Sequence, residues 1–312
     1  MHRLPIALFT SACLLAPLSC GSDASTDAEP SAAGGASIEV VASFYPLQYV
    51  VERVGGDRVS VANLTPSGAE PHELELTAQD TAELSDADLV VYLAGFAPVV
   101  DEGVADVADD HALDVSGAAD LTLTYTPIEE GEESTDEANT RDPHFWLDPT
   151  RLEAVATAVA ARLGEIDSAD AASFTANAAA LASDLRQLDG EYKAGLASCT
   201  NPVIVTSHNA FGYLASRYGL SQLGITGLTP EDEPSPGDLA AVTDFVKAHD
   251  VTTIYYETLV SPAIAETVAD ETGATTAVLD PIEGLSDASQ GADYFAVMRA
   301  NLANLRAGQG CT

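Results

Sequence analysis

The chain has 312 residues, of which 12 are lysine or arginine and 49 are aspartate or glutamate, so its formal net charge is −37. This length suggests about two domains, and an apolar fraction of 46% is enough for a sizeable core. The charge argues against a nucleic-acid-binding protein, because neutralising phosphates requires clustered basic side chains. It also makes an anionic membrane surface a poor electrostatic partner, whereas a cationic ligand would be attracted.

The N-terminal residues resemble an export signal. Arg3 is followed by an apolar run, Leu4–Leu18, that is too short to span a bilayer and fits a secretory signal peptide over residues 1–19. Cys20 follows a small residue, as in a bacterial lipobox, although Pro17 stands where leucine is usual. We therefore expect acylation of Cys20 and an extracytoplasmic protein anchored to the cell membrane by lipid. The alternative is an ordinary secretory signal, which would leave a periplasmic or secreted protein.

The segment after the signal and the remaining cysteines fit the same compartment. Residues 20–37 are rich in Ser, Gly, Ala and acids, which predicts a flexible tether without a core. Cys199 and Cys311 are the two cysteines of the folded body, and an even number in an oxidising compartment predicts a disulfide between them. A cysteine metal site is the alternative, but the sequence has no Cys-x-x-Cys spacing to support it.

From Ile38 onward, short β-branched runs alternate with helical patterns in both halves of the chain. Thr77 and Ser235 are predicted helix N-caps, and Pro236 stands at a first helical position. The predicted strands are 38–43, 58–64, 89–93, 112–115, 202–206, 222–226, 251–256 and 275–279, and the predicted helices are 46–54, 77–87, 98–109, 150–165, 169–196, 210–218, 236–249, 263–272 and 294–307. This alternation predicts two parallel-sheet α/β domains of the (βα)4 type.

A long helix is predicted between the two domains. The Ala-rich stretch 169–196 would extend about 40 Å, enough to run along both domains and to limit hinge motion. We place an N-terminal domain at 38–167, a linking helix at 168–198 and a C-terminal domain at 199–312, and we expect the binding site in the cleft between the domains. Within the first domain, residues 126–141 hold six acids, which predicts a mobile acidic loop.

Three histidines stand where α/β proteins bind ligands. His208 directly follows the predicted strand 202–206, and His72 lies in the loop after the strand 58–64. Both are therefore at the carboxyl edge of a sheet, the edge that forms binding sites in open α/β sheets. His144 lies in a proline-restricted segment beside the only tryptophan.

A carboxylate completes this set. Asp280 ends the predicted strand 275–279, and three imidazoles with one carboxylate suit Zn²⁺ in tetrahedral geometry. The other three histidines are interpreted as a signal residue, His2, and two surface residues, His111 and His249.

Four motifs occur in a characteristic order. They are Pro-His-Glu-Leu-Glu-Leu at 71–76, Asp-Pro-His-Phe-Trp-Leu-Asp-Pro at 142–149, His-Asn-Ala-Phe-Gly-Tyr at 208–213 with Arg-Tyr-Gly-Leu at 217–220, and Leu-Asp-Pro at 279–281. With these motifs the chain resembles the metal-binding receptors of bacterial zinc-uptake ABC transporters, the cluster A-I substrate-binding proteins. The resemblance covers essentially the whole mature chain, and segments 231–236 and 257–262 also look like landmarks of the family.

The resemblance implies a receptor that captures Zn²⁺ and delivers it to the permease and ATPase of an ABC importer. It implies that His72, His144, His208 and Asp280 bind the metal, with water or another acid as the alternative to Asp280. His208 favours Zn²⁺ over Mn²⁺, because manganese-type relatives have glutamate there. We expect a monomer that is not an enzyme. Many zinc-type relatives carry a His-rich loop where this chain has the acidic loop 126–141.

Three alternative functions remain open from the sequence. One is a manganese or iron receptor on the same fold, and another is a surface adhesin or metal buffer without an importer. The third is a zinc-dependent hydrolase, because His72-Glu73 begins a His-Glu-x-x-His motif. Leu76 stands at the second histidine position of that motif, and a metal held by four protein ligands lacks the open position that hydrolysis needs.

Overall fold

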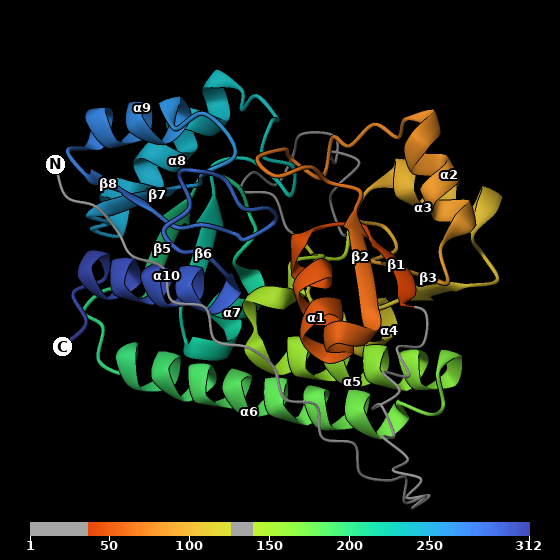
Figure 1. Cartoon of the computed structure of the whole chain (residues 1–312). Helices are drawn as coiled ribbons and strands as arrows, with labels where there is room; N and C mark the ends of the chain where they lie inside the picture. Colours follow the sequence, from red (N-terminus) through yellow and green to blue (C-terminus); the bar gives the residue numbers. More distant parts are fainter. Residues whose placement is uncertain (1–36, 126–139) are drawn as a thin grey trace, which may run out of the picture. The chain divides into compact units, whose positions relative to one another are not determined.

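A computed structural model describes residues 37–125 and 140–312, and in these residues two four-stranded parallel sheets carry the fold (Figure 1). The strand order is β2-β1-β3-β4 in the first sheet and β6-β5-β7-β8 in the second, so the two sheets have equivalent topology. The predicted pair of parallel-sheet α/β domains is therefore confirmed. The predicted signal peptide 1–19, the predicted acylation site Cys20, and nearly all of the predicted tether 20–37 and acidic loop 126–141 lie outside the described residues.

The first sheet is built around two apolar strands. Val40 of β1 pairs with Val61 of β2 on one side and with Leu89 of β3 on the other, and all residues of β3 except Tyr92 are fully buried. The strands are β1 Ile38–Ala42, β2 Val59–Asn63, β3 Leu89–Tyr92 and β4 Ala112–Asp114, and the helices are α1 Tyr45–Gly55, α2 Ala78–Asp86, α3 Pro98–Val107 and α4 Ser116–Ala119, with a 3-10 turn η1 at Gly56–Arg58. Thr77 caps α2 in a capping box with Asp80, as its position predicts.

The second sheet repeats this pattern in the second half of the chain. Val205 of β5 pairs with Leu223 of β6 and Ile254 of β7. The strands are β5 Val203–Thr206, β6 Ser221–Gly224, β7 Thr253–Tyr256 and β8 Thr275–Val278, and the helices are α7 Gly212–Tyr218, α8 Pro236–Ala248, α9 Ala263–Thr272 and α10 Tyr294–Gly308. Ser235 caps α8 and Pro236 occupies its first turn, which confirms the predicted start of that helix.

Two helices connect the sheets, and the second contacts both halves of the chain. These are α5 Pro149–Ile166, preceded by the 3-10 turn η2 Phe145–Leu147, and α6 Ala171–Gly195 with 25 residues. Near its start, α6 donates a hydrogen bond from Asn177 Nδ2 to the carbonyl of Val54 at 2.9 Å. Near its end, the hydroxyl of Tyr192 donates to the carbonyl of Met298 at 2.6 Å. None of the helices in the described ranges combines the length and apolarity needed to cross a membrane.

The differences from the predicted elements are small and have local causes. The helix α4 has four residues, too few to produce a periodic pattern, and was not predicted. The helix α6 begins two residues later than predicted, because the chain turns at Asp167–Asp170 before it starts. The domain boundaries at 167/168 and 198/199 remain a prediction.

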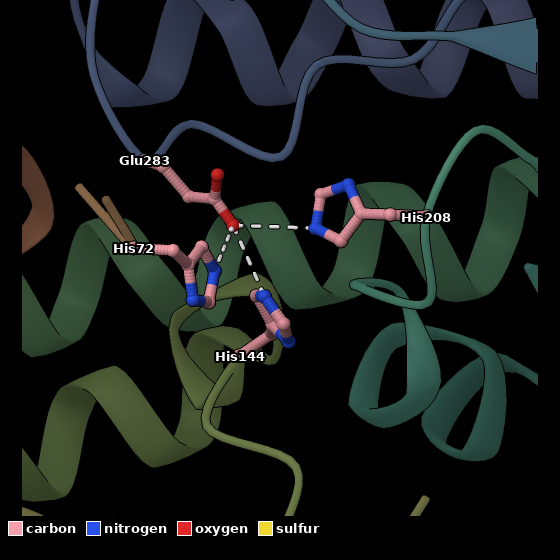
Figure 2. Close-up of side chains that lie close together, drawn as sticks. All are labelled: His72, His144, His208 and Glu283. Atoms are coloured by element: carbon pink, nitrogen blue, oxygen red, sulfur yellow. Dashed lines mark ion pairs between the residues drawn. The ribbon is translucent and has the colours of Figure 1, made fainter. Parts of the chain in front are cut away.

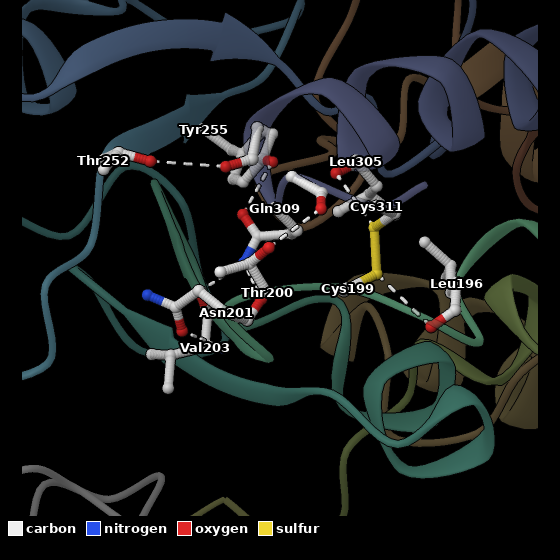
Figure 3. The surroundings of a disulfide bond; sticks show 12 residues. Leu196, Cys199, Thr200, Asn201, Val203, Thr252, Tyr255, Leu305, Gln309 and Cys311 are labelled. Atoms are coloured by element: carbon white, nitrogen blue, oxygen red, sulfur yellow. Dashed lines mark hydrogen bonds between the residues drawn. A yellow bond between two sulfur atoms is a disulfide. The ribbon is translucent and has the colours of Figure 1, made fainter.

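The predicted disulfide between Cys199 and Cys311 is present (Figure 3). Beside it, the side chain of Gln309 is 3% exposed and donates from Nε2 to the carbonyls of Asn201 and Val203 at 2.8 and 2.6 Å. The hydroxyl of Tyr255 donates to Gln309 Oε1 at 2.9 Å. The end of the chain is thus fixed to the second sheet by hydrogen bonds as well as by the covalent bond.

Candidate metal centre

The three predicted histidines come from separate loops and meet at one point. His72 lies in the loop between β2 and α2, and its backbone N–H donates to Glu70 Oε1 at 2.9 Å. His144 immediately precedes η2, and His208 follows β5 by two residues. Glu283, in the loop between β8 and α10, joins them, and the four side chains point toward one another in Figure 2.

The four side chains can each offer one ligand atom, and these atoms all lie within 4.8 Å of one another. Oε1 of Glu283 is 3.0 Å from Nε2 of His144, 3.4 Å from Nε2 of His208 and 3.5 Å from Nε2 of His72. The cluster is largely shielded from solvent, since His144 and Glu283 are 0% exposed, His208 is 1% exposed and the side chain of His72 is 7% exposed. A single small cation at the centre could therefore contact all four residues.

The polar atoms that face the centre lack hydrogen-bond partners. Nε2 of His72, His144 and His208 and both carboxylate oxygens of Glu283 are buried without one, so their short contacts with each other do not have hydrogen-bond geometry. Buried polar atoms are normally paired, because an unsatisfied group costs about 1–3 kcal/mol of stability. Three imidazole nitrogens and a carboxylate oxygen form a donor set that a divalent cation would satisfy, and Zn²⁺ accepts both ligand types.

Two further carboxylates orient two of the rings. Asp142 Oδ1 lies 2.8 Å from Nδ1 of His144, and Glu257 Oε1 lies 2.8 Å from Nδ1 of His208. A carboxylate accepts hydrogen bonds, so in the neutral ring Nδ1 carries the proton and Nε2 is free to bind a metal. Asp142 also accepts from the backbone N–H of His144 at 2.9 Å, which fixes the residue as well as its ring.

The same carboxylates favour the charged forms of these two histidines. Burial alone would lower the pKa of His208, but the facing carboxylates of Glu257 and Glu283 outweigh it and hold the pKa well above its usual range. A similar balance, with Asp142 in place of Glu257, raises the pKa of His144. The metal-free site therefore retains protons that a cation must displace.

The pKa values of His72 and Glu283 shift in the direction that favours cation binding. Burial lowers the pKa of His72, so its ring is neutral at neutral pH. Burial alone would raise the pKa of Glu283, but His208 and the other two histidines outweigh it and hold this pKa well below its usual range. Burial and the neighbouring Glu283 raise the pKa of Glu70 to about 10. Glu283 is thus charged at neutral pH, whereas Glu70 beside it is not.

The fourth residue of the cluster is Glu283, whereas the sequence predicted Asp280 as the fourth metal ligand. The structure does not place this side chain in the cluster, because its two oxygens accept hydrogen bonds from the backbone N–H of Ile282 at 2.8 Å and from Thr258 Oγ1 at 2.9 Å. Glu283, three residues further along, occupies the place expected for it. Asp280 and Glu283 both stand in the loop that follows β8, and only Glu283 belongs to the cluster.

The other two histidines of the described residues lie apart from this centre. His249 is exposed at the end of α8, and its Nδ1 lies 2.9 Å from the carbonyl of Phe245. His111 is partly buried in the turn before β4, with Nε2 2.9 Å from the carbonyl of Leu84. Both have local partners and neither belongs to the cluster.

Comparison with known proteins shows the family to which this chain is similar in sequence and fold. A family model described as ZnuA, the periplasmic component A of a zinc-uptake complex, matches residues 40–308. The chain belongs to the ZnuA family. This match includes the three histidines, Glu283 and both sheets, so the resemblance found in the four sequence motifs is confirmed.

Relatives of known name are similar over most of this ZnuA-family chain. The zinc-uptake protein ZnuA of Bacillus subtilis is 33% identical over 303 residues, which cover 95% of this chain and 94% of that protein. The zinc-binding lipoprotein AdcA of Streptococcus pneumoniae R6 is 34% identical over 306 residues, but the alignment spans only 60% of its length. Among solved structures, a Zn(II)-bound variant of Streptococcus pneumoniae AdcAII has a TM-score of 0.75 and 33% identity, covering 88% of this chain and 98% of that one.

Proposed function

We propose that the protein is an extracytoplasmic receptor that captures Zn²⁺ and delivers it to an ABC importer. The observation that carries this proposal is the buried cluster of His72, His144, His208 and Glu283, whose central atoms lack hydrogen-bond partners. Three imidazoles with one carboxylate favour Zn²⁺ over the oxygen-preferring cations Mg²⁺, Ca²⁺ and Mn²⁺. The names of the B. subtilis and streptococcal relatives support the same metal.

The ligand arrangement favours capture of the metal over catalysis with it. Four protein ligands fill a tetrahedral zinc sphere, whereas a catalytic zinc keeps a position for water or substrate. In this proposal the metal joins loops that follow β2 and β5, from the two sheets, to the Glu283 loop. The permease would then distinguish the loaded receptor from the metal-free one by the packing of these loops. The protein works as a monomer, held at the membrane by lipid on Cys20.

The binding half of the proposal is tested by titrating Zn²⁺ into the purified, metal-free chain and measuring heat and bound metal. We expect one Zn²⁺ per chain and much weaker binding of Mn²⁺. Glu283→Gln removes the one charged ligand without changing side-chain size, so its affinity should fall sharply. Asp293→Ala is the matched control, because Asp293 caps α10 outside the cluster and should leave the affinity unchanged. Equal affinity for Mn²⁺ and Zn²⁺ would contradict the choice of metal.

The delivery half needs a separate experiment in the cell. Deleting the gene should lower zinc uptake when the medium is zinc-limited, and the unchanged gene should restore uptake. A His208→Ala gene should not restore it, although its product is made and exported. Full uptake by the deletion strain would indicate a metal buffer or an adhesin instead of an importer's receptor.

A further inference from the structure

The loop that carries Glu283 is anchored to the other half of the molecule on both sides of this residue. On one side, Trp146 Nε1 donates to the carbonyl of Pro281 at 2.7 Å. On the other, the backbone N–H of Gly68 and the hydroxyl of Ser67 donate to the carbonyl of Leu285 at 2.9 and 2.8 Å. Trp146 lies two residues from the metal ligand His144, so two of the four ligands are held close together by a direct link.

Between these anchors the backbone adopts a conformation that its residue disfavours. Ile282 has a φ of 61°, one of three positive-φ positions that are not glycine in the described residues, and its side chain is 0% exposed. A β-branched residue in the left-handed region is a genuine outlier and persists only where the surroundings impose it. Glu283 is the next residue, so the direction of its side chain depends on this strained turn.

The side chain of Asp280 is hydrogen-bonded to this turn. One carboxylate oxygen accepts from the backbone N–H of Ile282 at 2.8 Å, and the other accepts from Thr258 Oγ1 at 2.9 Å. Asn301 of α10 holds the backbone of Asp280 through two hydrogen bonds, from Asp280 N to Asn301 Oδ1 at 2.9 Å and from Asn301 Nδ2 to Asp280 O at 2.6 Å. The Asp280 and Asn301 side chains are each 1% exposed, so water does not compete for these bonds.

We propose that Asp280 is a positioning residue for the metal centre: it holds the strained Ile282 peptide, with Asn301 fixing Asp280 in turn, so that Glu283 faces the three histidines before metal arrives. This inference rests on the proposed function, because it concerns the geometry of the same zinc site. It gives Asp280 the role of hydrogen-bond acceptor and leaves metal contact to Glu283.

Two substitutions at Asp280 separate a positioning role from metal ligation. Asp280→Asn keeps an oxygen that accepts from the Ile282 N–H and a group that can pair with Thr258, but it removes the charge that a metal ligand supplies. Asp280→Ala removes both hydrogen bonds. We expect Asp280→Asn to bind Zn²⁺ about as tightly as the unchanged protein, and Asp280→Ala to bind about 10–100-fold more weakly, as for other residues that support a metal ligand.

The absorption spectrum of bound Co²⁺ gives a readout that a loss of stability alone does not change. Asp280→Asn should reproduce the spectrum of the unchanged protein, and both Asp280→Ala and Asn301→Ala should alter it, since Glu283 shifts against the metal. Asp293→Ala, at the start of the same helix α10, should reduce thermal stability with no change in the spectrum. If Asp280→Ala does not fold, comparing the zinc affinity of Asp280→Asn with that of Glu283→Gln still separates a positioning role from metal ligation.

Two outcomes would overturn the inference. A loss of affinity in Asp280→Asn as large as that in Glu283→Gln would show that the Asp280 charge acts on the metal. An Asp280→Ala protein with unchanged affinity and an unchanged Co²⁺ spectrum would show that the turn does not need Asp280. Failure of the proposed function itself is distinguishable, because the unchanged protein would then bind neither Zn²⁺ nor Co²⁺.

Discussion

Two polar clusters link distant parts of the chain, and they differ in whether the polar atoms that face one another are hydrogen-bonded. Around Arg217, Nε lies 2.6 Å from Asp189 Oδ1 on α6 and 3.2 Å from Asp148 Oδ1 at the start of α5, and Lys193 Nζ adds a contact of 2.7 Å to Asp189. The metal centre instead leaves three imidazole nitrogens and a carboxylate without hydrogen bonds. The protein itself supplies the partners of the Arg217 cluster, whereas the facing atoms of the metal centre would find theirs in a bound cation.

Loss of one metal ligand should have the largest effect on zinc affinity. His208→Ala removes the imidazole that the β5 loop contributes, so the remaining ligands fill three of four positions. We expect affinity to fall by more than about 100-fold, because even residues that only support a ligand cost about 10–100-fold when removed. Competition with a chelator of known affinity measures this loss. A decrease of only a few-fold would mean that the metal binds elsewhere.

Acidification should have the next largest effect on zinc affinity. The loss of affinity should begin at a higher pH than in a site whose histidines have unperturbed pKa values. Protons compete with zinc for Nε2, and the pKa values of His144 and His208 are both raised by facing carboxylates. Affinity should therefore decrease steadily as pH falls from about 8 to about 5.5, because each displaced proton adds to the pH dependence. Titrations in buffers of different ionisation enthalpy should show proton release at neutral pH. An affinity that is constant across this range would contradict a three-histidine site.

Removing the carboxylate that orients His208 should lower zinc affinity by a smaller factor and should also change its pH dependence. Glu257→Gln keeps the size of the side chain but removes the charge that faces His208 Nδ1 at 2.8 Å. Zinc affinity at high pH should fall by about 10-fold, the lower end of the range for such partners. The pKa of His208 should fall as well, so the weakening by acid should begin at a lower pH. A pH profile that is unchanged would show that Glu257 does not control this histidine.

A substitution in the cluster around Arg217 should lower the stability of the protein and leave its zinc affinity unchanged. Arg217→Ala leaves the carboxylates of Asp189 and Asp148 short of a partner, which should lower the free energy of unfolding by about 1–3 kcal/mol. Arg217 is not in the metal centre, so zinc affinity should stay the same. Chemical denaturation of the metal-free protein, followed by zinc titration, measures both quantities. A large loss of zinc affinity without a loss of stability would remove the distinction between the two clusters.

The parts of this structure that depend on local patterns were predictable from the sequence. The capping residues Thr77 and Ser235 determine where α2 and α8 begin, and strand-helix alternation determines the parallel sheets. His208 could be identified because it comes two residues after a parallel strand, and His72 because it lies in the loop that follows another, and such loops form the binding edge. These inferences need only a few neighbouring residues.

The choice between Asp280 and Glu283 could not be made in this way. It depends on the left-handed turn at Ile282 and on the hydrogen bond from Trp146 to Pro281, two residues 135 positions apart in the chain. No local pattern in the sequence reports such a contact. The short helix α4 was missed for a different reason, since four residues carry too little periodicity to be detected.

A crystal structure of the zinc-loaded protein, with anomalous scattering recorded at the zinc edge, would show the metal and its ligands directly. We expect one strong peak at about 2.0–2.2 Å from Nε2 of His72, His144 and His208 and from a carboxylate oxygen of Glu283. Asp280 should lie outside ligand distance and still accept from the Ile282 N–H. A peak away from the three histidines, or one with Asp280 in place of Glu283 as a ligand, would contradict this expectation.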